Sequence, residues 1–112
     1  MKVRAISKDV GMSPLKVRMV VDVVRGKRVH EALAILKFMP TPAAKAVAKT
    51  VQSAAANAEN NYQMVPAELK IVSITTEKGH VAKRFRPQAR GRAAPIFRRS
   101  CHILVVVAGE EA

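Results

Sequence analysis

Aromatic residues and cysteine are scarce in this chain. Its 112 residues include three Phe, one Tyr, no Trp and a single cysteine, Cys101. The core must therefore be aliphatic, and so few aromatic residues argue against the base-stacking surfaces of RRM-like or OB-like domains. One cysteine cannot form an internal disulfide, and we expect a reducing, cytoplasmic compartment.

Long apolar runs are missing as well. The longest uninterrupted run covers residues 103–108, which is far too short to span a bilayer. The first nine residues contain no apolar segment of the kind found in secretory signals. We therefore expect no membrane span.

The groupings of residues that catalysis or metal binding needs are also missing from the sequence. The eight acidic residues show no local pairing for acid–base chemistry. Cys101 and His102 are adjacent, so in a strand they would point to opposite faces and could not act as nucleophile and base. The three histidines lack metal-ligand spacing, and the glycines do not form a phosphate-binding loop. We expect no catalytic residue, no metal and no cofactor.

Positive charge, by contrast, is in excess and is concentrated in one segment. Residues 78–99 contain eight Lys and Arg and no Asp or Glu, within a formal net charge of +12. A free loop with this charge would repel itself and stay disordered. We therefore interpret it as an arm that is held at its base and folds against a polyanion, for which nucleic acid is the obvious candidate. The alternative is a solvated flexible loop.

Periodic apolar residues and helix-start signals predict three helices. Two Ser/Thr-Pro pairs, at 13–14 and 41–42, combine an N-cap with a proline at the first helical position. Gly26 is a plausible stop for the first helix. The expected helices run from Ser13 to about Gly26, from about Val29 to Phe38, and from Thr41 to about Asn60.

Three segments are strand-like: Lys2–Lys8, Leu69–Thr76 and Ser100–Ala108. The last is apolar on both faces, so we expect it to be central in the sheet and covered by helices. The order β, α, α, α, β, arm, β predicts an α+β fold, with three helices packed on a small antiparallel three-stranded sheet. We expect a single domain, 1–112, with the arm at about 78–99.

The middle of the arm is rich in residues that disturb strands. Pro87, Gly91 and Pro95 cluster there. Because proline cannot donate to a β-ladder, we expect an irregular tip rather than a regular ribbon.

A second basic set flanks the first helix, at Lys16, Arg18, Arg25, Lys27 and Arg28. Lys16 and Arg18 lie near the helix N-terminus, where exposed N–H groups favour phosphate. The alternative is an amphipathic helix with a solvated basic face. For Lys45 and Lys49, on the third helix, we prefer the solvated face.

Four segments together resemble one protein family. They are 13–27 (SPLKVRMVVDVVRGK), 53–60 (SAAANAEN), 83–92 (KRFRPQARGR) and 102–107 (HILVVV). In order and spacing they are similar to the bacterial large-ribosomal-subunit protein L-twenty-two family. The resemblance covers nearly the whole chain, with one departure at Gln88, where the family usually has a basic residue.

The resemblance implies a fold, a place and a set of partners. It implies a small α+β domain packed on large-subunit ribosomal RNA near the polypeptide exit. It also implies a long extended β-hairpin that lines the exit tunnel. The implied partners are large-subunit ribosomal RNA, neighbouring ribosomal proteins and the nascent polypeptide, and the implied role is subunit assembly.

Carried over to this chain, the resemblance and the charge pattern give two sets of site residues. The tunnel-facing tip falls at Arg90, Gly91, Arg92 and Ala93. The expected RNA-binding residues are Lys16, Arg18, Arg25, Lys27, Lys78, Lys83, Arg84, Arg86, Arg90, Arg92, Arg98 and Arg99.

Two other classes stand beside a structural RNA-binding protein. A DNA-bending architectural protein also uses basic β-arms with a proline near the tip, although such proteins need paired arms from a symmetric dimer. An enzyme is the third class, and no substrate pocket can be named for it from the sequence.

Overall fold

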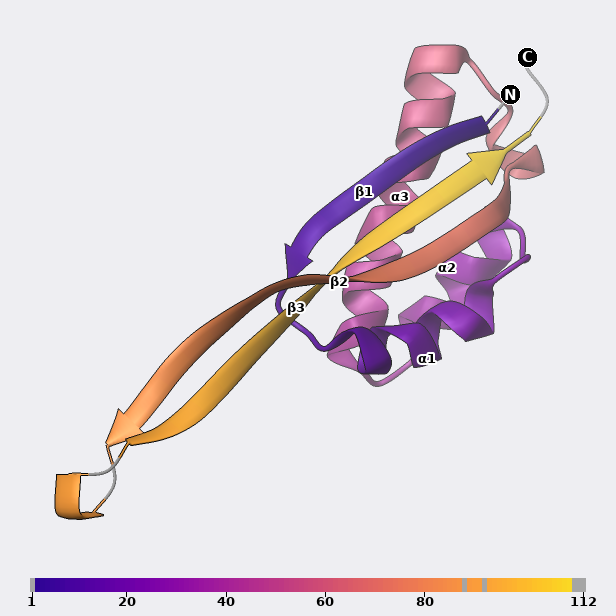
Figure 1. Cartoon of the computed structure of the whole chain (residues 1–112). Helices are drawn as coiled ribbons and strands as arrows, with labels where there is room; N and C mark the ends of the chain where they lie inside the picture. The colour runs from indigo at the N-terminus through magenta and orange to yellow at the C-terminus, as the bar shows by residue number, and fades with distance from the viewer. Residues whose placement is uncertain (1, 88, 92, 110–112) are drawn as a thin grey trace.

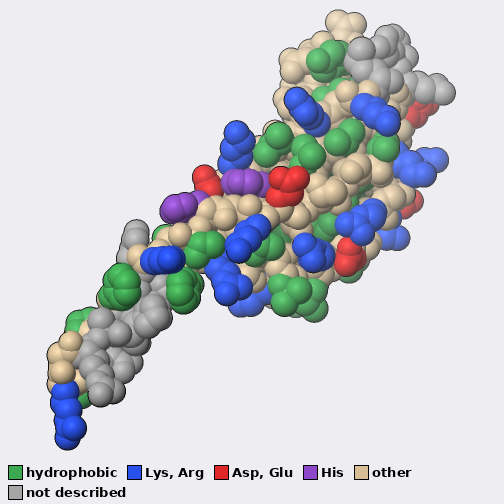
Figure 2. Space-filling model, viewed as in Figure 1, with side chains coloured by type: hydrophobic (Ala, Val, Ile, Leu, Met, Phe, Trp, Pro, Cys, Tyr) green, Lys and Arg blue, Asp and Glu red, His purple; other side chains and the backbone are tan. Residues whose placement is uncertain are grey.

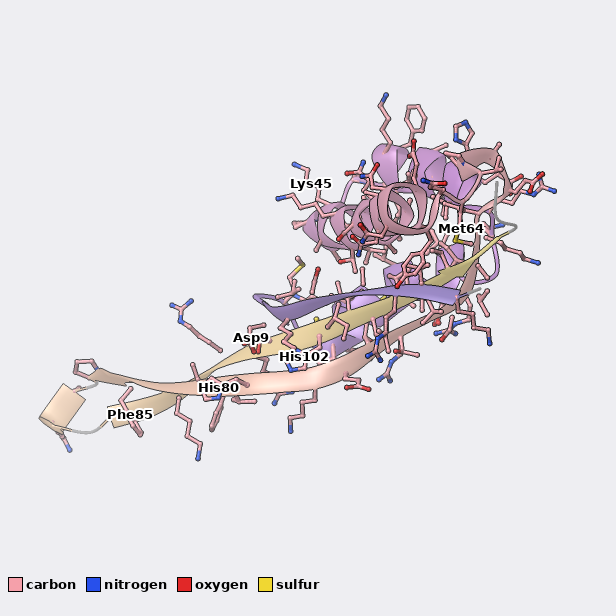
Figure 3. The ribbon with its side chains drawn as sticks, turned by 90° about the horizontal axis from the view of Figure 1, so that it is seen from above. Asp9, Lys45, Met64, His80, Phe85 and His102 are labelled. Atoms are coloured by element: carbon pink, nitrogen blue, oxygen red, sulfur yellow. The ribbon has the colours of Figure 1, made fainter. Side chains whose placement is uncertain are left out.

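The computed structural model describes residues 2–87, 89–91 and 93–109, with the backbone alone at positions 84, 86 and 93–96. Three antiparallel strands form one sheet in the order β1-β3-β2. All three helices lie on one side of it (Figures 1 and 3), so the expected α+β class is confirmed. The elements are β1 (Lys2–Val10), α1 (Pro14–Val24), α2 (Val29–Phe38), α3 (Pro42–Tyr62), β2 (Lys70–Pro87) and β3 (Ala93–Ala108), with short 3₁₀ turns at Pro66–Glu68 and Ala89–Gly91.

The helix ends follow from local signals. Thr41 caps α3, its Oγ1 accepting a hydrogen bond from the Ala44 backbone N–H at 3.3 Å. Gly26 follows the end of α1 with φ +79°, a conformation that glycine adopts without steric cost. Ser13 holds the extended N-cap conformation before α1, but its side chain makes no capping bond in the described structure.

An aliphatic core fills the space between helices and sheet. The small buried face of α3, which includes Ala44, Val47, Ala54 and Ala58, allows this helix to approach the sheet closely. All four aromatic residues are exposed. The sequence-based expectation of a core without aromatic rings is thus confirmed.

Strand β3 is central, as predicted, but the helices cover only one of its faces. Burial alternates along it: Cys101, Ile103, Val105 and Val107 are buried, whereas the residues between them are half-buried. The prediction that helices cover this strand is therefore right for one face and wrong for the other. Figure 2 shows apolar side chains on the face that the helices leave open.

The arm is the long extended β-hairpin that the resemblance implied, and it is irregular over a shorter stretch than its prolines predicted. Strands β2 and β3 extend beyond the sheet as a paired ribbon that continues to the pair Pro87↔Ala93, and Figure 1 shows it projecting from the body. Pro87 and Pro95 occupy pairs two positions apart, with Arg86↔Ala94 between them. Antiparallel pairs alternate between hydrogen-bonded and non-hydrogen-bonded, so the two prolines fall in pairs of the same kind. Proline has no N–H and fits only the non-hydrogen-bonded kind, which needs no donor. The ribbon therefore accommodates both prolines, and the irregular geometry that they predicted lies at the short turn Ala89–Gly91.

Two irregularities mark the root of the arm, one on each side of β3. Register shifts interrupt β1 between Ser7 and Val10, and β2 between Lys78 and Val81. The two register shifts lie opposite neighbouring residues of β3. β-Bulges of this kind increase the local twist of the strands. At the second one, a Cβ on Gly79 would lie 2.8 Å from Ser100 Oγ, so only glycine fits without a shift. The whole molecule measures 67 × 26 × 17 Å.

Candidate nucleic-acid interface

The start of α1 lies beside the root of the arm. Two adjoining hollows, of about 380 and 340 Å³, open between residues 11–18 and the arm. Parts of the two basic sets, which the sequence separates by some 60 residues, therefore meet in one place. The cations that line the two hollows are Lys16, Arg18, Lys78, Arg98 and Arg99.

The electrostatics of this cluster, which we call the root cluster, favour an anion. Among the described residues that line the hollows, none is acidic. The first turn of α1 also carries no acid, and the Ser13 side chain does not cap it. The free N–H groups in the first turn of α1 and the positive end of the α1 dipole therefore add to the positive potential of the five cations. A phosphate group would find both charge and hydrogen-bond donors here.

Farther along the arm, cations occupy both faces of the ribbon. Lys83 pairs with Phe97 and Ala82 pairs with Arg98, so Lys83 and Arg98 belong to adjacent register pairs, whose side chains face opposite sides of the ribbon. Both side chains are exposed. An arm charged on two faces suits a position surrounded by polyanion better than one lying on a flat surface. Figure 2 shows Lys and Arg side chains along the arm.

The predicted arginines in the outer arm are only partly described. Arg84 and Arg86 lie in the backbone ladder of β2, and Arg92 lies outside the described residues, as does Gln88.

The tip reverses the chain within a few residues. Arg90 and Gly91 are both left-handed, at φ +62° and +72°, and both are exposed. Successive positive φ angles are what tight hairpin reversals require. Ala93, the last residue of the predicted tip, opens β3.

Arg25 and Lys27 lie away from the root cluster. Arg25 follows the other end of α1, roughly 10 Å along the helix axis from Arg18. There its guanidinium forms an ion pair with Asp22, 2.8 Å from Nη1 to Oδ1, and donates to the Ile74 carbonyl at 3.1 Å. The bond to Ile74 ties the end of α1 to β2 and gives Arg25 a structural role.

Lys27 contributes to the fold through its backbone. Its carbonyl accepts a hydrogen bond from the Ile71 N–H at 3.0 Å, and its side chain is half-buried.

Cys101 and His102 point to opposite faces, as predicted. Cys101 is fully buried, and burial raises the pKa of its thiol. His102 is half-buried, and its Nδ1 accepts a hydrogen bond from the Asp9 backbone N–H at 3.0 Å. In the described part of the chain, no three His, Cys, Asp or Glu side chains gather where they could hold a metal ion. None of the described helices is long and apolar enough to cross a membrane.

Phe97 is a site residue that the sequence analysis did not identify. It lines the second hollow together with Lys16 and the two arginines that follow it. The sequence shows too few aromatic residues for a stacking array, and it does not show that two of them become neighbours on the arm. The signal lies in the strand register, which depends on pairing between distant segments.

Comparison with known proteins places the chain in a family. The family model described as "Ribosomal protein L22p/L17e" matches residues 5–108. A protein of Dehalococcoides mccartyi named "Large ribosomal subunit protein uL22" is 60% identical over 108 residues, covering 96% of this chain and 99% of the relative. Proteins with the same name from Desulforamulus reducens and Herpetosiphon aurantiacus are 51% and 50% identical, covering 99% and 96% of this chain and 98% and 95% of the relatives. With its body, its arm and nearly its full length matched, the chain belongs to the ribosomal protein L22p/L17e family.

Proposed function

We propose that this protein is a structural constituent of the large ribosomal subunit, in the cytoplasmic ribosome. It binds large-subunit ribosomal RNA as a single domain, supports subunit assembly beside neighbouring ribosomal proteins, and inserts its arm into the nascent-polypeptide exit tunnel. The names of the relatives support the coarse role. The observation that carries the RNA-binding role is the root cluster, where the start of α1 and the base of the arm present five cations together.

The root cluster and the arm have different tasks in this proposal. The root cluster holds phosphates against a rigid part of the fold, so it fixes the orientation of the body on RNA. The arm then extends from that anchor, charged on both faces, into an RNA-lined passage. The exposed tip at Arg90 and Gly91 is the end farthest from the body, and it faces the passing peptide.

Salt-dependent binding tests the role of the root cluster. The probe is in-vitro-transcribed bacterial large-subunit ribosomal RNA. Arg18→Gln combined with Lys78→Gln removes two cations from the hollows and should weaken binding. It should also make the slope of log K against log salt shallower by roughly one to two units.

The matched control is Lys45→Gln combined with Lys49→Gln, which removes the same charge from exposed positions on α3. It should leave the slope nearly unchanged. Equal effects of the two pairs would show that binding follows net charge alone and would overturn the assignment of the site. Duplex DNA as competitor tests the DNA-bending alternative, which requires that DNA displace the ribosomal RNA.

A further inference from the structure

Two of the three phenylalanines are neighbours on one face of the arm. Phe85 pairs with Pro95 and Phe97 pairs with Lys83, two register positions apart. Directly paired residues share a face, and so do alternate residues of a strand, so the two rings are diagonal neighbours on the same face. Phe85 is labelled on the arm in Figure 3.

Both rings are open to solvent. Phe85 is 69% exposed and Phe97 is 51% exposed. Single exposed apolar residues are common and need no explanation. Two aromatic side chains that are neighbours on a projecting ribbon are different, because each keeps more than half of its surface open to solvent and together they offer apolar ring surface in one place.

The charges around this pair select the kind of partner. Lys83 stands directly opposite Phe97, and Arg98 and Arg99 follow it. Phe97 also lines a hollow of the root cluster together with Lys16. A partner that fits must therefore offer flat apolar surfaces and regularly spaced negative charges together. Unpaired nucleotides have both, since their bases stack on aromatic rings while their phosphates meet Lys and Arg.

We propose that Phe85 and Phe97 form a stacking platform for unpaired bases of the bound RNA. The phosphates next to these bases lie over the adjoining cations of the root cluster. This inference rests on the proposed RNA-binding function and deepens it, because it assigns to the arm a base-contacting site in addition to phosphate neutralisation.

Removal of each ring with retention of apolar bulk tests the platform. Phe85→Leu and Phe97→Leu should each weaken binding to in-vitro-transcribed large-subunit ribosomal RNA by about tenfold. The slope of log K against log salt should stay unchanged, because stacking releases no counterions. Phe85→Tyr should bind like the original chain. The control is Phe38→Leu, which removes an 82% exposed ring at the end of α2 and should have no effect.

A fluorescent probe reports stacking directly. The chain contains no Trp, so Phe85→Trp introduces a single tryptophan at the platform. Its emission should be quenched by a single-stranded RNA oligonucleotide and much less by an RNA duplex of the same length, whose bases are already stacked. Phe38→Trp serves as the control for charge-driven quenching.

The outcomes separate this inference from the function on which it rests. If the unaltered chain does not bind the ribosomal RNA, the proposed function fails. If the unaltered chain binds the ribosomal RNA and both Leu variants bind it as tightly as the unaltered chain does, the platform alone is overturned. The platform is also overturned if the Leu variants bind RNA normally but fail to enter large subunits, because the rings would then contact a protein.

Discussion

The imidazole Nδ1 of His102 accepts a hydrogen bond from the backbone N–H of Asp9 at 3.0 Å, across 93 positions of sequence. Asp9 is left-handed, at φ +54°, within the irregular end of β1. Because Nδ1 is the acceptor, the neutral ring carries its proton on Nε2. This contact fastens the end of one outer strand to the central strand at the root of the arm, where Figure 3 labels both residues.

Loss of this acceptor should loosen β1. His102→Leu leaves the Asp9 N–H without its partner, and we expect the free energy of unfolding to fall by about 1 kcal/mol. Urea unfolding measures this change. His80→Leu, at an exposed position of the arm, is the control and should have little effect. Equal stability of the His102 variant and the original chain would show that the contact contributes nothing.

The close approach at Gly79 should appear as coupling between two residues. Gly79→Ala places a methyl group 2.8 Å from Ser100 Oγ, whose hydroxyl donates to the His80 carbonyl. We expect a loss of about 1–3 kcal/mol from overpacking. In a Ser100→Ala background the loss should be smaller, because the clashing oxygen is gone. A double-mutant cycle measured by thermal unfolding checks this, and strictly additive effects would contradict the contact.

The buried thiol predicts a pH dependence. Burial raises the pKa of Cys101, so the unfolded chain loses this proton at lower pH than the folded chain. The stabilising contribution is complete below the unfolded pKa and is lost as pH rises through the folded pKa. Between about pH 7 and pH 10, a span that contains the ordinary thiol pKa, the original chain should lose more stability than Cys101→Ala. Urea unfolding at the two pH values tests this, and parallel losses would refute it.

Thr76 offers a stabilising substitution. Its Oγ1 is buried without a hydrogen-bond partner in the described structure. Thr76→Val replaces the hydroxyl with a methyl group of similar shape, and we expect a gain of about 1 kcal/mol in the free energy of unfolding. Thr75→Val, at the exposed neighbouring position, should change stability little. A destabilised Thr76→Val variant would mean that a bound water serves this hydroxyl.

Substitutions at the tip and in the core should have different effects. A Cβ built on Gly91 meets no atom within 4 Å, although the left-handed φ of +72° makes a side chain there strain the turn. The strain is confined to the tip, so Gly91→Trp should leave the body folded and bound while it alters passage of particular nascent chains. Val105→Asp buries an unpaired charge in β3, should cost several kcal/mol, and should prevent incorporation into subunits. Subunit sedimentation and ribosome profiling compare the two. Loss of incorporation in the Gly91 variant would argue against a tunnel-facing tip.

Local chemistry made the body of the fold predictable. The caps at Thr41 and Gly26 act within one helical turn. The spacing of apolar residues in α1 and α3 correctly predicts which face of each helix is buried. The third helix ends at Tyr62, two residues beyond the predicted Asn60, because Gln63 takes up the left-handed cap conformation there. The cationic composition of the arm likewise needed no structure to be recognised.

Long-range register was what the sequence could not supply. The pairing of Pro87 and Pro95 at positions without ladder donors depends on how β2 meets β3. The same register makes neighbours of Phe85 and Phe97. The convergence of α1 with the arm depends on the packing of segments more than 60 residues apart, and the side-chain contacts of Arg25 depend on β2. Local patterns do not encode these relationships.

The two irregularities lie where the arm joins the body, so the direction of the whole arm depends on the geometry at this one place. About nine residues of β2 extend beyond Lys78, which corresponds to roughly 30 Å. A rotation of the arm by about 10° at its root would therefore move the tip by about 5 Å over that length. The close packing at Gly79 and the hydrogen bonds of Ser100 and Asp9 thus set the direction of the arm. Changes there would misplace the tip without touching it.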